Sequence, residues 1–285
     1  TLHALSCILD AHFSNNIFKK PSSLIFYATV TNIIVIPFLF VFGTPAFPSL
    51  SVFAVIFAIA LIDVFYQIPY YIALRKVDTS ITVALFSLGK ISVPILAYFI
   101  VGEKLHLSQY IGFGIILLSS FLLNFDRKKL KLNIAFFLML IVSLVLSLAS
   151  VLEKYSLERV DFITLVFWMT LLTTVISLSF LFIKNLRKDI KNTFPKFKKK
   201  FNLFISNEIL SQGGTLAMII ALSQLPVLTI KSINSSQSIF TLFFGFVLYK
   251  ILGNKFKENL KPAEVIKKLI CFVFIMFGIY LVLKG

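Results

Sequence analysis

Residues 70–121 decide the fold: YYIALRKVDTSITVALFSLGKISVPILAYFIVGEKLHLSQYIGFGIILLSSF. A polar break at residues 73–80 separates the end of one apolar segment from a second at residues 81–101. The second is long enough to cross a bilayer, which takes about 20 residues. A Gly-Glu-Lys corner at residues 102–104 turns the chain, and residues 111–123 return. Because backbone polar groups in hydrocarbon must pair within their own segment, these lengths predict a helical hairpin embedded in lipid.

The composition predicts a membrane protein. Hydrophobic residues make up 58% of the chain and charged residues 14%, whereas a soluble domain carries about 25% charged residues. We therefore predict an all-α polytopic membrane protein. Lys and Arg number 28 against 12 Asp and Glu, and most of them lie between apolar runs. The expected partners of these basic loops are anionic lipid headgroups, not nucleic acid.

Ten transmembrane helices are predicted, with one long hydrophilic loop at residues 184–200. The spans cover residues 1–18, 23–42, 51–73, 80–101, 108–124, 133–152, 162–183, 202–222, 227–248 and 266–283. Basic residues gather in the loops after odd-numbered spans. Positive residues are retained in the cytoplasm, so these loops are expected inside and the protein in the cytoplasmic (inner) membrane.

The two halves of the chain repeat one polar pattern. Asp63, Gln67 and Pro69 have the same spacing as Glu208, Gln212 and Gly214. Five spans in each half require the second half to be inverted, so we predict two inverted five-helix repeats at residues 1–126 and 127–285. Pro and paired Gly weaken a helix, and Pro69 and Gly213-Gly214 interrupt corresponding spans. Such interruptions mark the site in secondary transporters.

The run at residues 73–123, with its Gly-Glu-Lys corner, resembles EamA-like members of the drug/metabolite transporter superfamily. Lys19-Lys20 and Glu153-Lys154, each closing the first span of its half, are similar to the family pattern. The chain departs from it at Asn254, where the second repeat often has Glu. The resemblance implies a transporter of small metabolites, often an exporter, driven by an ion or exchange gradient.

Ionisable residues inside the spans are few: Asp10, Asp63, Lys90, Glu208 and Lys231. A charge at mid-bilayer costs about 2.5–3.5 kcal/mol, so each is expected to face a wet cavity or a partner. The predicted substrate-binding residues are Asp63, Tyr66, Gln67, Lys90, Glu208, Gln212, Asn234 and Gln237. The predicted proton-coupling residues are Asp10, Asp63 and Glu208, because a carboxylate in low dielectric keeps a proton more readily.

Packing interpretations stand beside these. Asp63 and Glu208 are alternatively paired with Lys90 or Lys231 in ion pairs that only fix the helices, and Lys231 alternatively snorkels to the surface.

Several other polar and aromatic residues have a packing interpretation too. The run at residues 234–238 and the pairs Ser108–Gly112 and Ser143–Ser147 fit helix contacts. Tyr66, Tyr70, Tyr71 and Trp168 are expected to line a pocket. Alternatively, Tyr70 and Tyr71 belong to an aromatic belt at the membrane interface. Glu103 is expected to favour the N-terminus of the fifth span. Cys7 and Cys271 are interpreted as small core residues.

Enzyme chemistry is not supported by the sequence. The histidines are His3, His12 and His106, and the sequence shows no metal-type His/Cys cluster, nucleophile motif or phosphate loop. No catalytic residue, metal or cofactor is therefore predicted. The predicted function is secondary active transport of a small organic metabolite, by a monomer or homodimer. The alternatives are a flippase for a lipid-linked substrate, a membrane-embedded enzyme and a non-transporting scaffold.

Overall fold

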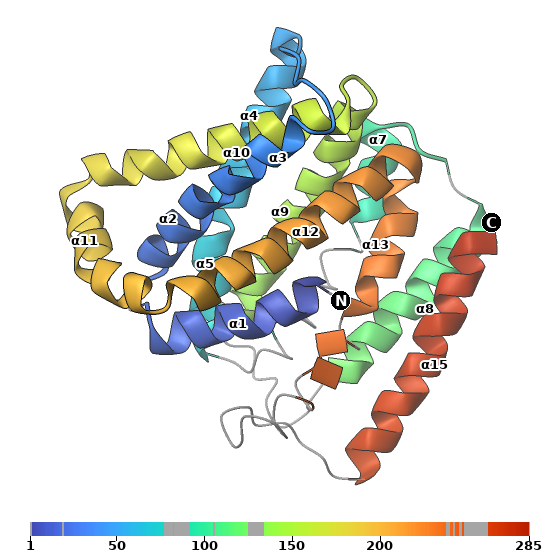
Figure 1. Ribbon diagram of the computed structural model, residues 1–285. Coiled ribbons are helices and arrows are strands. Elements are labelled where there is room, and N and C mark those ends of the chain that lie inside the picture. The colour runs from blue at the N-terminus through green and yellow to red at the C-terminus, as the bar shows by residue number, and fades with distance from the viewer. Residues whose placement is uncertain are drawn as a thin grey trace.

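The computed structural model describes residues 2–18, 20–76, 82, 90, 92–104, 106–124, 134–237, 240–241, 243–244, 247 and 262–284. Within these ranges the chain is helical and forms no strand. The helices are α1 (Leu2–Asn16), α2 (Pro21–Thr31), η1 (Asn32–Ile34), α3 (Val35–Leu39), α4 (Leu50–Phe65), α5 (Gln67–Lys76), α7 (Val93–Ile100), α8 (Leu107–Asn124), α9 (Ile134–Leu157), α10 (Phe162–Leu178), η2 (Ser179–Phe182), α11 (Lys184–Lys199), α12 (Phe201–Gln224), α13 (Val227–Ser235) and α15 (Pro262–Lys284). Figure 1 shows them as one bundle.

Five helical segments of the described chain are long and apolar enough to cross a membrane. They are Pro21–Leu39, Leu50–Lys76, Phe137–Leu157, Phe162–Phe182 and Phe201–Gln224. The outer surface agrees, because large apolar side chains cover it: Phe182 is 89% exposed and Phe99 is 79% exposed. A soluble monomer rarely exposes so many large apolar side chains. The prediction of an all-α membrane protein is confirmed.

The helix ends fall into two groups. At one end, Arg75 Nη2 donates to the carbonyl of Phe18 (2.9 Å), and Tyr27 Oη donates to the carbonyl of Ile190 (2.8 Å). At the other end, Trp168 Nε1 donates to the carbonyl of Ala46 (2.9 Å). The described chain segments after the first, third and seventh predicted spans therefore lie at the same end of the bundle, the end that carries Arg75 and the lysines of α11. This agrees with the prediction that they share one side.

Glu103 lies in the predicted corner, but the helix that its carboxylate was expected to favour was wrong. Its carboxylate oxygens accept from the backbone N–H of Val227 at 2.9 and 3.2 Å. Val227 begins α13, and Pro226 before it supplies no side-chain cap. The carboxylate therefore stabilises the unsatisfied N-terminus of α13, not that of α8.

Residues 184–199 form the helix α11 and not the predicted loop. Ile190 and Phe197 are seven residues apart, which places them on one helix face, and both are buried. The exposed face carries lysines, and Asp189 pairs with Lys20 before α2. Low hydropathy concealed this amphipathic pattern.

The two predicted helix interruptions have different outcomes. The third span breaks at Tyr66, between α4 and α5, and Pro69 lies in the first turn of α5. The prediction is therefore confirmed there. In contrast, α12 runs unbroken through Gly213 and Gly214, because glycine keeps the N–H that proline lacks. Gly214 instead makes room for α1: a Cβ there would lie 2.9 Å from His3 Nε2.

Gly112 confirms one predicted helix contact. In Figure 1, α8 and α15 run side by side. A Cβ on Gly112 would lie 2.6 Å from the carbonyl oxygen of Gly278, so the two backbones touch there. The boundary at residues 126/127 and the Gly253-Asn254-Lys255 echo lie outside the described residues, as do residues 80–91 of the predicted span at 80–101, apart from residues 82 and 90.

Candidate functional site

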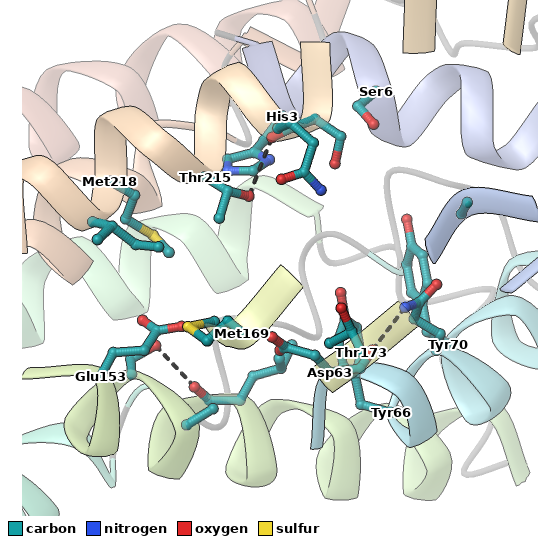
Figure 2. Close-up of a pocket in the computed structure, with 18 of the residues that line it drawn as sticks. His3, Ser6, Asp63, Tyr66, Tyr70, Glu153, Met169, Thr173, Thr215 and Met218 are labelled. Carbon is teal, nitrogen blue, oxygen red and sulfur yellow. Dashed lines mark hydrogen bonds between the residues drawn. The ribbon is translucent and has the colours of Figure 1, made fainter. Parts of the chain in front are cut away.

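A cavity of about 310 Å³ lies inside the bundle. Helices α1, α2, α4, α5, α9, α10, α12 and α13 contribute to its wall (Figure 2). Every predicted site residue lines it: Asp10, Asp63, Tyr66, Gln67, Lys90, Glu208, Gln212, Asn234 and Gln237. Side chains from residues 10 to 237 of the chain are thus gathered around one space.

Asp10 is held by neighbours from two other helices. Asn207 Nδ2 of α12 donates to Asp10 Oδ1 at 2.9 Å, and Tyr70 Oη of α5 donates to Asp10 Oδ2 at 3.5 Å. A buried carboxylate is costly without donors, and these two reduce that cost. They also fix α1 against α5 and α12.

Glu208 lies one helical turn before Gln212 on α12, and both meet Asn32 of η1. With the Asn32 amide in the orientation that satisfies both of its atoms, Nδ2 donates to Glu208 Oε2 (3.1 Å). Its Oδ1 then accepts from Gln212 Nε2 (2.7 Å). The amide of Asn32 in η1 is therefore hydrogen-bonded both to the carboxylate of Glu208 and to the amide of Gln212.

Asp63 lies where α4 ends. Gln67 Nε2 donates to the backbone carbonyl of Asp63 at 2.7 Å, across the break at Tyr66. This bond satisfies backbone at an interrupted helix. Gln67 thus has a structural task as well as a place in the cavity wall, and the Asp63 side chain is directed into the space (Figure 2).

The lysines of the cavity lie deep in the protein. Lys231 of α13 is only 7% exposed, so the snorkelling interpretation is wrong. Its ammonium lies within electrostatic reach of Asp63 and Glu153. Lys90 lines the same cavity. The structure therefore groups acids with bases, as a polar site inside an apolar bundle requires.

Glu153 is a lining residue that the sequence prediction missed. It was placed at a span end with Lys154, yet it is 5% exposed and lines the cavity. A periodic signal was present: Ser143, Ser147, Ser150 and Glu153 share one face of α9. The first three line the cavity too, which the interpretation of the Ser143–Ser147 pair as helix contacts did not include. Their hydroxyls donate to carbonyls of their own helix at 2.9–3.0 Å.

The aromatic predictions divide. Tyr66, Tyr70 and Tyr71 line the cavity and the last two are buried, so the interfacial-belt interpretation is wrong for them. Trp168 is not among the residues that line the cavity. Its ring packs on the rings of Phe47 and Phe53. His3 and Cys7 of α1 line the cavity without having been predicted to do so.

Metal binding finds no support in the part of the chain that the structure describes. No three His, Cys, Asp or Glu side chains there are grouped to hold a metal ion. Cys7 and Cys271 are both buried, which agrees with their prediction as small core residues.

An apolar outer surface, several potential membrane spans and a charged inner cavity are features that membrane transporters have. Residues 5–125 match the model of the EamA-like transporter family, which is part of the drug/metabolite transporter superfamily. The predicted resemblance is confirmed, and the family consists of membrane transporters of small molecules, not enzymes.

Comparison with curated proteins finds no significant match. Among 27 matching chains of solved structures, one described only as a crystal structure of a protein superposes with a TM-score of 0.58. The two sequences are 13% identical, and the match covers 98% of this chain and 92% of the other. At this identity the likeness shows the fold alone, and it extends over nearly the whole chain.

Proposed function

We propose that the protein is a secondary active transporter that moves a small organic metabolite across the cytoplasmic membrane. The observation that carries the proposal is the cavity of about 310 Å³, which holds ionisable side chains inside a lipid-facing bundle. Its volume is at the small end of ligand pockets. A non-transporting scaffold needs no such space, and charges that lipid would reject are retained around it.

The proposed architecture is ten helices in two inverted repeats, at residues 1–126 and 127–285. Two observations support it. Asp63 and Gln67 from α4 and α5, and Glu208 and Gln212 from α12, have equal spacing and line one cavity. Arg75 and Lys20, which follow odd-numbered spans, are both held at the same end of the bundle as α11 and Phe18. In such a transporter the repeats rock around the shared site.

The proposed substrate-binding groups are the eight predicted residues of the cavity wall. Asp10, Asp63 and Glu208 are proposed to couple transport to protons, since each is a carboxylate held away from bulk water. Protons or substrate exchange would then drive transport, and family members are often exporters. The exposed lysines of α11 are proposed to rest on anionic lipid headgroups, which attract basic helices at the membrane surface.

The test uses purified protein in proteoliposomes. A thermal-shift screen against amino acids, sugars, nucleotides and amines first identifies a compound that binds the native state and raises its melting temperature. Uptake of that radiolabelled compound is then measured with and without a pH gradient. We expect Asp63→Asn and Glu208→Gln to lower uptake and to flatten its pH dependence.

Glu158→Gln is the matched control, because Glu158 is an exposed carboxylate beyond the end of α9 that pairs with Arg159. Wild-type uptake and pH dependence in both cavity variants would refute proton coupling. Absence of uptake by the wild-type protein, for every compound that binds, would refute transport.

A further inference from the structure

We infer that the cavity takes a neutral polyhydroxyl compound, a sugar or sugar alcohol, whose O–H groups donate to hydroxyl oxygens of the cavity wall. The inference rests on the proposed transport function and names the substrate class of that site. Two observations carry it: where the wall hydroxyls direct their own protons, and the presence of both signs of charge around one small space.

Six hydroxyl side chains of the described cavity wall donate their protons to the backbone. Each bonds a carbonyl oxygen three or four residues earlier in its own helix, at 2.8–3.1 Å. A carbonyl oxygen only accepts, so the hydroxyl is the donor in every case. The six are Thr29 of α2, Ser143, Ser147 and Ser150 of α9, Thr173 of α10 and Thr215 of α12.

Toward a ligand, these six hydroxyls therefore act as acceptors. A hydroxyl group has one proton and two lone pairs, and here the proton is already bonded. No residue that the structure describes donates to any of the six oxygens, so the protein leaves their acceptor capacity unused. In Figure 2, Thr173 and Thr215 lie on opposite sides of the space. A ligand that fills the cavity has to present donors on several sides, which carboxylates and phosphates do not.

Both signs of charge line the same cavity of about 310 Å³. The carboxyl groups are those of Asp10, Asp63, Glu153 and Glu208, and the amino groups are those of Lys90 and Lys231. A ligand with a net charge comes close to a like charge here whichever sign it carries, and such repulsion is strong away from bulk water. A neutral ligand avoids this cost.

The charged groups also have neighbours in the protein that balance them, so a zwitterionic ligand is not required. Asp10 accepts from Asn207 at 2.9 Å. Glu208 accepts from Asn32 at 3.1 Å. Lys231 lies within electrostatic reach of the other two acids and of the second lysine. The unused groups are the neutral acceptors, and sugars and sugar alcohols match them because they are neutral and carry several O–H donors.

The experiment measures binding to the full-length protein in detergent by thermal shift and titration calorimetry. The probes are erythritol, xylitol, sorbitol, D-ribose and D-glucose, each with an amino and a carboxylic acid derivative of the same carbon skeleton. We expect at least one neutral probe to bind, and its two charged derivatives to bind at least about tenfold more weakly. Absence of binding by all the neutral probes, or equal binding of a charged derivative, would overturn the inference.

Substitutions test the acceptor hydroxyls. Thr173→Val and Thr215→Val keep the shape of the side chain, remove its oxygen and should each weaken binding of the neutral probe about two- to tenfold. Thr215→Ser keeps the oxygen and should bind more tightly than Thr215→Val, which separates a lost acceptor from a packing effect.

Thr193→Val is the matched control. Thr193 Oγ1 makes the same kind of bond to the carbonyl of Asp189 (2.7 Å), but on α11 and outside the cavity, so this variant should bind the probe as the wild type does. Unchanged binding in both cavity valine variants would refute a role of the wall hydroxyls as acceptors and with it the inference.

Uptake of the same probes into proteoliposomes separates the two proposals. Binding of a neutral probe that is weakened by Thr215→Val, without uptake, would contradict transport but leave the polyhydroxyl site standing. Uptake of charged compounds alone, unaffected by the valine variants, would contradict the polyhydroxyl site and leave transport standing.

Discussion

The contact between α8 and α15 gives a quantitative prediction for Gly112→Ala. The added Cβ would lie 2.6 Å from the carbonyl oxygen of Gly278 and 2.9 Å from Cβ of Leu281. Carbon and oxygen ordinarily approach to about 3.3 Å, so the helices must separate by about 3.3 − 2.6 = 0.7 Å. The obstacle is backbone, which cannot rotate away. Overpacking of this kind costs about 1–3 kcal/mol.

Gly114→Ala on the same helix is the matched control, because nothing lies within 4 Å of the Cβ it would add. Both substitutions gain the helix propensity of alanine, about 1 kcal/mol, so their difference isolates the packing term. Reversible unfolding in mixed micelles, followed by circular dichroism, should show Gly112→Ala to be less stable than Gly114→Ala by about 1–3 kcal/mol. Equal stability of the two variants would show that α8 and α15 are not in backbone contact at Gly112.

Three further changes test other contacts. Glu103→Ala should lower the free energy of unfolding by about 1–2 kcal/mol, since α13 loses its cap; an unchanged midpoint in the same micelle assay would contradict this. Asn207→Ala removes the 2.9 Å donor to Asp10 and should cost about 1–3 kcal/mol, with Asn202→Ala at the exposed start of α12 as the control. Replacing Lys188 and Lys191 by Gln should reduce the stabilisation by anionic over neutral nanodisc lipids by about 1 kcal/mol per lysine; full retention would exclude lipid contact at α11.

The polar residues of the cavity were predictable because a membrane leaves few places for them. An ionisable side chain inside an apolar span must face a cavity or a partner. This single constraint located Asp10, Asp63, Lys90 and Glu208 without knowledge of how the helices pack. The equal spacing of Asp63–Gln67 and Glu208–Gln212 added the expectation that two distant helices meet around one space.

The remaining site residues depend on where the helix ends lie, which hydropathy does not report. Lys231 is near the start of α13, but that start is itself buried, as Val227 and Leu228 show. A residue there cannot reach the surface. Glu153 was missed because the predicted span ended at residue 152, before Glu153 and its neighbour Lys154, whereas α9 runs on to Leu157. The serine periodicity of α9 was the better guide.

Helix α11 is a second case in which mean hydropathy was misleading, because it predicted a loop where the chain forms a packed helix. Its lysines lower the local hydropathy, and a loop was predicted from that average. Ile190 and Phe197 nevertheless lie on one face and are buried against the bundle, where Phe197 stacks on Tyr27 with ring centroids 4.2 Å apart. The spacing of the apolar residues predicts whether such a segment is a helix, whereas its mean polarity does not.

The central claim is that the cavity is the place through which substrate passes, and Cys7 tests it most directly. Its sulfur lines the cavity and accepts a hydrogen bond from Gln237 Nε2 (3.5 Å), whereas Cys271 is not among the lining residues. In a Cys271→Ser background, uptake of the bound compound into proteoliposomes is measured before and after treatment with methanethiosulfonate ethylammonium. We predict that the reagent labels Cys7, that bound compound slows the labelling, and that labelling abolishes uptake. Unchanged uptake with Cys7 fully labelled would contradict the claim.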